Sequence, residues 1–300
     1  MTDALADRRL LLVHAHPDDE SSQTAATMAR YAAEGAQVTL VTCTLGELGE
    51  IVAEDLRETV TVGESLGRHR IGELTEAMAA LGVTDFVRLG GDGRWHDSGM
   101  TATDDFGTAR AVDEVAEGAF WHADLLEASL PLVEIIRDRR PQVVVTYDPF
   151  GNYGHPDHVM AHRVAMYASQ LAAAPYRPDL GDPWTVERIL WITMSADDTV
   201  AMLQQAKEAG LELPWSFDLD QPLPPMFTRD ELLAARIPTR PWNEQKLAAL
   251  RAHRSQVDMS DPFWSMLTTA NDRSAECYVL ASGTPMPPGG PADDLFAGIV

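Results

Sequence analysis

The sequence predicts an α/β protein with a Rossmann-like, mostly parallel sheet flanked by helices, and with a smaller C-terminal elaboration. Residues 9–15 form a continuous apolar run, which is typical of a strand buried on both faces. A helical segment over residues 22–34 and a second apolar run over residues 38–42 follow at the spacing of a parallel crossover unit. Because such crossovers are right-handed, helices are expected on both faces of the sheet.

The later elements follow from the same patterns. Gly35 and Gly82 stand where helices end, and Pro156 suits the first turn of a helix. Apolar residues at helical spacing predict a helical region over residues 53–81. The remaining strands are expected at residues 86–89, 143–147, 188–194 and 276–281, and the remaining helices at residues 124–139, 156–174, 197–209 and 242–254.

Two later segments carry little periodicity. Residues 210–240 are rich in proline, and either a lid or a larger elaboration fits them. Residues 283–294 read as a disordered or loosely packed tail.

Composition limits the classes of partner. The 300 residues are 45% hydrophobic, which is ample for a core, and the net charge of −23 would repel nucleic acid and anionic membranes. No apolar run approaches the roughly 18 residues that a membrane span needs, and the charged first nine residues lack a signal core. We therefore expect a cytoplasmic protein without a membrane or nucleic-acid partner. Cys43 and Cys277 lie in strand-like runs, which favours buried thiols over a disulfide. The oligomeric state is left open.

Two polar motifs follow predicted strands. The segment His16-Pro17-Asp18-Asp19-Glu20 comes after the first strand, and His155-Pro156-Asp157-His158 comes after the strand that ends at Tyr147. Because the carboxyl ends of parallel strands line one crevice, the two motifs should meet there. Two imidazoles and one carboxylate, from His16, Asp19 and His158, would leave open positions, as in a catalytic metal site.

The neighbouring residues fit hydrolysis. Asp18 is free to accept a proton from a water that the metal makes more acidic. His155 lies one helical turn before His158 and could be a protonated electrophile or general acid. Asp157 could orient His155, or could be a helix N-terminal charge. Tyr153 could reach a developing oxyanion, or could be a packing aromatic.

Together these motifs resemble the PIG-L/LmbE family of metal-dependent N-acetylglucosamine deacetylases, and in particular its mycothiol-biosynthesis branch. The resemblance is strong over residues 9–170. Further matching segments are Thr42-Cys43-Thr44, Gly46-Glu47, residues 70–74, residues 93–100 and residues 145–149. The sequence departs from the family at Gln23-Thr24-Ala25-Ala26-Thr27, where many members have a glycine pair, and at His96, where an arginine is expected.

The resemblance implies roles for residues. His16, Asp19 and His158 would hold zinc, with ferrous iron as a possible alternative. Asp18 would be the general base, and His155 the general acid or oxyanion partner with Tyr153 assisting. The resemblance also implies that Arg70 and Asp97 bind sugar or inositol hydroxyls. Residues 1–300 would form one deacetylase domain, with a catalytic sheet core at residues 9–174 and a C-terminal elaboration at residues 175–300.

The implied reaction is hydrolysis of the N-acetyl group of 1D-myo-inositol 2-acetamido-2-deoxy-α-D-glucopyranoside (GlcNAc-inositol). Amidase activity on mycothiol S-conjugates is the nearest alternative, because Glu20-Ser21-Ser22 also resembles that branch. A non-catalytic metal or sugar binder is an alternative of another class. A nucleotide-binding oxidoreductase fits poorly, since the first strand-to-helix turn lacks G-x-G-x-x-G and carries acidic residues instead.

Overall fold

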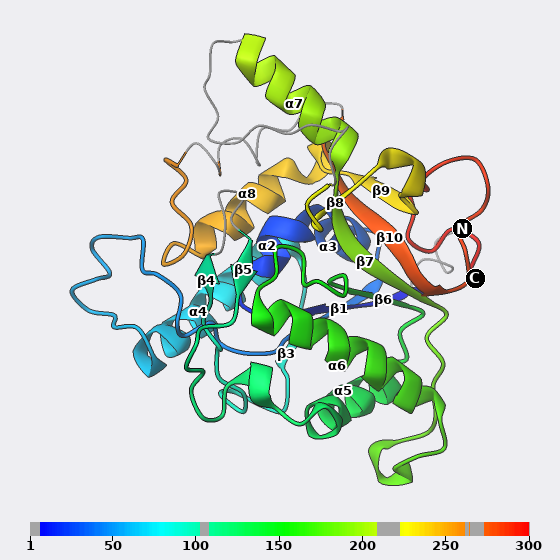
Figure 1. Ribbon diagram of the computed structural model, residues 1–300. Coiled ribbons are helices and arrows are strands. Elements are labelled where there is room, and N and C mark those ends of the chain that lie inside the picture. The colour runs from blue at the N-terminus through cyan, green and yellow to red at the C-terminus, as the bar shows by residue number, and fades with distance from the viewer. Residues whose placement is uncertain (1–6, 103–107, 209–222, 262–263, 265–272, 300) are drawn as a thin grey trace.

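The computed structural model describes residues 7–102, 108–208, 223–261, 264 and 273–299. A central sheet has the strand order β3-β2-β1-β6-β7-β10-β9, with β8 added beside β7, and helices cover it (Figure 1). The parallel part consists of β1 (Arg9–His14), β2 (Gln37–Thr42), β3 (Asp85–Arg88), β6 (Val143–Thr146), β7 (Arg188–Ser195) and the short β8 (Phe227–Thr228). The antiparallel part consists of β9 (Ala235–Pro238) and β10 (Ala275–Gly283). The expected Rossmann-like, mostly parallel sheet is confirmed.

The described helices are α2 (Asp19–Gln23), α3 (Ala25–Ala33), α4 (Glu64–Leu81), α5 (Leu125–Arg139), α6 (Pro156–Ala173), α7 (Ala196–Glu208) and α8 (Asn243–Ala252). Short 3₁₀ turns lie at Phe120–His122, Pro178–Leu180, Asp230–Leu232 and Arg240–Trp242, and β4 (Thr101–Ala102) pairs antiparallel with β5 (Ala109–Arg110). None of the helices in these ranges is long and apolar enough to cross a membrane.

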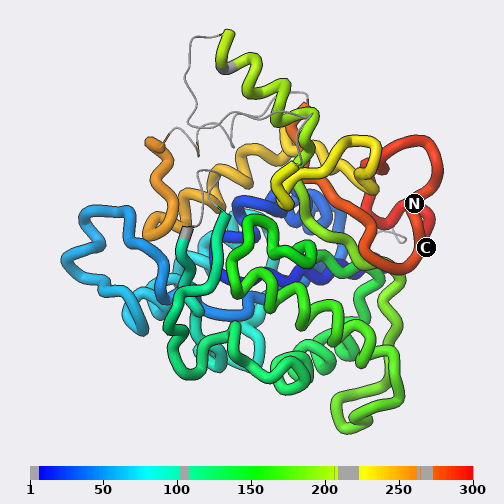
Figure 2. Tube along the Cα trace, viewed as in Figure 1, coloured from blue at the N-terminus to red at the C-terminus, as the bar shows by residue number. Residues whose placement is uncertain are grey.

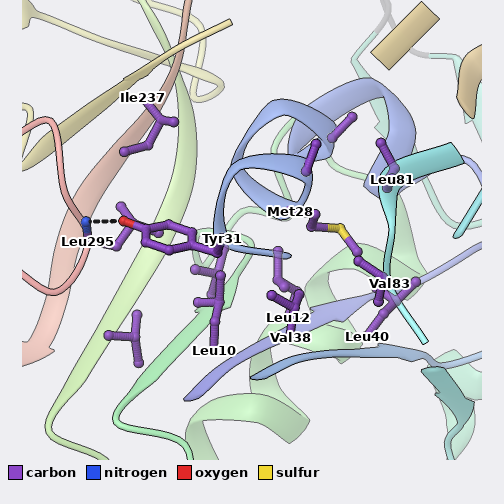
Figure 3. Packing of buried hydrophobic residues seen from close by; sticks show 14 of the residues in the cluster. Leu10, Leu12, Met28, Tyr31, Val38, Leu40, Leu81, Val83, Ile237 and Leu295 are labelled. Atoms are coloured by element: carbon purple, nitrogen blue, oxygen red, sulfur yellow. Dashed lines mark hydrogen bonds between the residues drawn. The ribbon is translucent and has the colours of Figure 1, made fainter. Parts of the chain in front are cut away.

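The core has two layers because successive residues of a strand face opposite sides of the sheet. On β1, Leu10 and Leu12 pack with residues of α3, α4 and α8, whereas Leu11 and Val13 pack with residues of α5 and α6. Figure 3 shows the first layer, in which Met28 and Tyr31 of α3 lie over the strands. Buried aliphatic side chains on both faces explain the continuous apolar runs.

The topology creates one crevice. The chain runs from β1 to β2 on one side, but β6 pairs with β1 on the other side. The sheet order thus reverses at β1, and ligands bind outside the carboxyl ends of the strands at such a switch point. Both polar motifs of the sequence follow the two strands that flank this point.

Three local expectations are wrong. The first helix is interrupted at Thr24 (φ −137°), so α2 and α3 are separate, and the region from residue 53 becomes helical only at Glu64. The C-terminal segment is held rather than loose, because Arg8 pairs with Asp294 at 2.9 Å and Leu295 is buried. Figure 2 shows this segment in red, close to the start of the described part of the chain. The proline-rich segment 210–240 lies partly outside the described residues. Cys43 and Cys277 are buried free thiols, as expected.

Candidate metal centre and active site

The first motif forms a tight turn between β1 and α2. Asp18 has φ 108°, a left-handed conformation that is uncommon for residues other than glycine. Side chains of the motif close this turn, since the N–H of His16 donates to Asp19 Oδ2 at 2.9 Å and the N–H of Asp18 donates to Glu20 Oε2 at 2.8 Å. The turn therefore separates the two adjacent carboxylates and lets them serve different partners.

The second motif forms the start of α6. His155 is the N-cap, and its Nδ1 accepts a hydrogen bond from the N–H of Asp157 at 3.1 Å. Pro156 occupies the first turn as expected, where its missing N–H costs nothing. The side chain of His158 is fully buried, and its ring stacks on Tyr147 with centroids 4.2 Å apart. The position of His158 is thus fixed by packing rather than by hydrogen bonds.

The three predicted ligands converge. Asp19 Oδ2 lies 3.4 Å from His16 Nδ1, and Asp19 Oδ1 lies 3.3 Å from His158 Nε2. Neither ring nitrogen of His158 makes a hydrogen bond with a described residue, although both are buried. A buried imidazole without a hydrogen-bond partner is costly unless its nitrogen binds something else. The unpartnered nitrogen of His158 therefore fits a metal ligand. Asp19 reaches the two imidazoles through different carboxylate oxygens, whereas His16, His155 and His158 each have a donor atom within 4.8 Å of the others.

Other donors surround this cluster. One donor atom each from His16, His155 and His158 lie within 4.8 Å of one another, and the same holds for His16, Asp97, His155 and Asp157. Burial opposes protonation of His16, but Asp97, Asp157 and Asp19 together raise its pKa well above the usual value. This excess of carboxylates favours a positive charge at the centre of the cluster.

Asp157 orients a different residue from the one expected. Its Oδ2 accepts from His16 Nε2 at 3.1 Å and from the N–H of Ser98 at 2.9 Å, so its carboxylate orients His16 and not His155. The expectation that this carboxylate orients His155 is wrong, because α6 places the Asp157 side chain beside His16, which follows β1. A carboxylate bonded to one nitrogen of an imidazole leaves the other nitrogen free for a metal. Ser98, which also donates its hydroxyl to Asp157, was not predicted.

His155 and Tyr153 lie beside the cluster. The His155 ring is 4.6 Å from His16 and 6.2 Å from Tyr153, measured between centroids. Burial, with His16 and His158 nearby, lowers the pKa of His155 well below the usual value, which favours the neutral imidazole. With Nδ1 accepting from the backbone, Nε2 carries the proton. Burial and nearby carboxylates raise the pKa of Tyr153, which keeps its hydroxyl as a donor.

Arg70 holds the proposed base. Its Nη2 donates to Asp18 Oδ2 at 2.8 Å and also to the carbonyl of Pro17, while Nη1 donates to the carbonyl of Gly46 at 2.5 Å. Gly46 has φ 62°, and a Cβ there would lie 2.0 Å from Arg70 Nη1, so glycine is required. Burial raises the pKa of Asp18 to about 6, against the opposing effect of Arg70.

Asp97 connects two loops of the site. Its carboxylate accepts from the N–H of Gly99 at 2.8 Å and from the N–H of Leu48 at 3.2 Å. These bonds tie the loop after β3 to the loop after β2. The predicted contacts of Arg70 and Asp97 with substrate hydroxyls stay predictions.

Two further residues reach this site from elsewhere in the sequence. His253, at the end of α8, lies 2.7 Å from Glu20 Oε1. Gln23 donates to Asp19 Oδ1 at 3.2 Å from the segment that departs from the family pattern. The sequence assigned neither of them, and Glu20 also had no role.

A Rossmann-like sheet with a buried histidine and carboxylate cluster at its switch point is the architecture of a metal-dependent hydrolase class. The chain belongs to the family described as PIG-L: GlcNAc-PI de-N-acetylase, which it matches over residues 11–169. Both polar motifs lie within this match, and the resemblance inferred from them is confirmed.

Two relatives are similar in sequence to this protein over nearly the whole chain. A 1D-myo-inositol 2-acetamido-2-deoxy-alpha-D-glucopyranoside deacetylase from Nocardioides sp. is 50% identical over 300 residues, covering 98% of this chain and 99% of the relative. An enzyme of the same name from Kribbella flavida is 48% identical, covering 98% and 99%. Among solved structures, N,N'-diacetylchitobiose deacetylase from Pyrococcus horikoshii has a TM-score of 0.60 at 19% identity, covering 91% of this chain and 83% of that one. At this identity the structural likeness concerns the fold.

Proposed function

We propose that this protein hydrolyses the N-acetyl group of GlcNAc-inositol to give glucosamine-inositol and acetate. The observation that carries the proposal is the near-full-length similarity to deacetylases named for this substrate. The convergence of His16, Asp19 and His158 in one crevice supports it, because amide hydrolysis needs an activated water and a polarised carbonyl.

We propose His16, Asp19 and His158 as the ligands of a divalent cation, either zinc or ferrous iron. The unpartnered nitrogens of His158 and the carboxylate that holds His16 support this donor set. When bound, such a cation would make water more acidic and withdraw electron density from the acetyl carbonyl.

The chain's own residues would move the protons. Asp18 accepts a proton from the attacking water, whose oxygen adds to the acetyl carbon. The Nε2–H of His155 and the hydroxyl of Tyr153 donate hydrogen bonds to the carbonyl oxygen as it gains negative charge. The C–N bond then breaks, and the leaving amine takes up a proton that Asp18 returns. The immediate products are acetic acid and the free amine, and the acid then loses the second water-derived proton to the amine or to solvent to give acetate.

Substrate binding completes the proposal. Arg70 and Asp97 are buried beside Asp18 and His16, respectively. The Nε–H of Arg70 has no hydrogen-bond partner among the described residues. As the family resemblance implies, we propose that Arg70 and Asp97 bind hydroxyls of the sugar or inositol.

The test is a deacetylation assay with GlcNAc-inositol, run before and after chelation and again after re-addition of zinc or ferrous iron. Activity should disappear with the metal and return with it. The variant Asp18→Asn should bind metal as the wild type does but lose about 10²- to 10⁴-fold in kcat, the usual contribution of a general base. A mycothiol S-conjugate is assayed in parallel, and hydrolysis of that compound alone would reassign the protein as an amidase.

A further inference from the structure

A buried pair joins the N-terminal and C-terminal parts of the chain. The side chains of Glu20 and His253 are both 0% exposed, and His253 Nε2 lies 2.7 Å from Glu20 Oε1 across 233 residues of sequence. The hydroxyl of Ser21 donates to the same oxygen at 2.5 Å. The Glu20 carboxylate therefore cannot rotate without breaking two hydrogen bonds.

The other oxygen of Glu20 holds the backbone of Asp18. Glu20 Oε2 accepts from the N–H of Asp18 at 2.8 Å, and Asp18 has the left-handed φ of 108°. Such a conformation costs about 1–3 kcal/mol and persists only where surrounding groups enforce it. On the opposite side, Arg70 holds Asp18 Oδ2 at 2.8 Å. Backbone and carboxylate of Asp18 are thus fixed by separate partners.

We propose that Glu20 and His253 are positioning residues for Asp18. His253 fixes the Glu20 carboxylate, and Glu20 in turn holds Asp18 in the conformation that directs its carboxylate into the crevice. This inference rests on the proposed role of Asp18 as general base. It gives α8, in the C-terminal part of the chain, a direct part in the reaction geometry.

A second buried pair, formed by a residue of α8, attaches this helix to the rest of the fold without a hydrogen bond to Asp18 among the described residues. Lys246 Nζ lies 3.0 Å from Glu276 Oε1 and 2.9 Å from the carbonyl of Ser22. Glu276 accepts from the N–H groups of Ala26 and Thr27 at the start of α3. This pair also attaches α8 to the N-terminal helices, but in the described part of the chain it makes no hydrogen bond to Asp18 or Glu20. It therefore supplies a matched control.

The test compares His253→Met with His253→Gln. The two side chains have nearly the same size, but only glutamine can donate to Glu20. In the metal-loaded protein we expect His253→Met to lower kcat by about 10- to 100-fold, as small displacements of reacting groups do, with KM changed by less than about twofold. Metal content per chain should equal that of the wild type. His253→Gln should retain kcat within about threefold.

Lys246→Met is the control for lost docking. It should lower the unfolding midpoint at least as much as His253→Met, yet keep kcat within about twofold of wild type, because it leaves Asp18 in place. A crystal structure of His253→Met should show the φ of Asp18 relaxed to a negative value. If His253→Met does not fold, His253→Gln still tests the inference through its kcat.

Several results would overturn the inference. These are a wild-type kcat in His253→Met, an equal kcat loss in Lys246→Met, or a large kcat loss in His253→Gln with its bond to Glu20 intact. Asp18→Asn identifies which proposal has failed. Wild-type turnover in Asp18→Asn would refute the base assignment itself, whereas an inactive Asp18→Asn beside a fully active His253→Met would refute only the positioning.

Discussion

Replacing Arg188 by methionine should release the C-terminal segment from the sheet. Arg188 is the first residue of β7, and its side chain is fully buried. Its guanidinium donates to the carbonyls of Thr284 (2.8 Å), Pro285 (3.0 Å), Leu295 (2.6 Å) and Ala297 (2.8 Å). Methionine keeps most of the apolar stem but removes every donor, so these carbonyls lose their buried partner.

The cost is set by the easier of two responses. If the segment stays in place, four bonds from a charged donor, worth about 1.5–3 kcal/mol each, are lost. If it detaches, Leu295 and Phe296 become exposed, at about 1.5–3 kcal/mol each. Figure 3 shows Leu295 held by the hydroxyl of Tyr31. Detachment is the smaller loss, and regained chain entropy offsets part of it, so we expect about 2–4 kcal/mol.

Urea denaturation and limited proteolysis test this expectation. Arg188→Met should unfold at lower urea concentration and be cut within residues 284–299 before the rest of the chain. The control is Arg139→Met, which removes a half-exposed ion pair with Asp85 (2.7 Å) and should cost at most about 1 kcal/mol. A loss below about 1 kcal/mol in Arg188→Met, with the segment still resistant to protease, would refute the reasoning.

Two further predictions concern the metal site and the pH dependence of stability. Gly151 has φ 75°, and a Cβ there would lie 2.7 Å from the N of Val159 and 3.0 Å from His158 Cβ. Gly151→Ala should therefore displace His158. We expect metal affinity, measured by calorimetry, to fall about 10- to 100-fold. Gly35→Ala is its control, since φ is 87° but nothing lies within 4 Å, and equal affinity loss in both would argue against displacement. Hydrogen bonding from Arg139 lowers the pKa of Asp85, so this carboxylate stabilises the fold above its unfolded pKa of about 4, and the contribution disappears as pH falls through the lower folded value. At pH 7 the free energy of unfolding of the wild type should exceed that of Asp85→Asn by less than about 1 kcal/mol, and near pH 2.5 the two values should be equal. A stability difference that persists at low pH would show that the ionised Asp85 carboxylate is not its source.

The sheet was predictable because its strands are buried on both faces. Leu10 to Val13 must be apolar throughout, and such a run is visible without knowing any tertiary contact. The meeting of His16 with His158 was predictable for a related reason, since parallel strands carry their following loops to one edge. Chain direction alone therefore brings together residues that are far apart in sequence.

Contacts that depend on side-chain direction were not predictable. The helix ending near His253 was expected, but nothing in its local sequence says that this residue reaches Glu20. Arg188 is similar, because an arginine at the start of an apolar strand usually faces solvent, whereas here it binds carbonyls of a later segment. Asp157 was placed correctly on α6, yet which imidazole it holds depends on the rotation of that helix against β1.

The conformation of Asp18 could not be predicted from the residues next to it in the sequence. Local preference would place glycine or asparagine at a φ of 108°, and either would relieve the strain. Neither could accept a proton from water near neutral pH, so the proposed chemistry and the local conformation make opposite demands on this position. The conflict is settled by partners outside the motif, Arg70 on the carboxylate and His253 through Glu20 on the backbone. Where function overrides a local rule, the compensating residues lie elsewhere in the fold, and here one of them comes from the C-terminal helix.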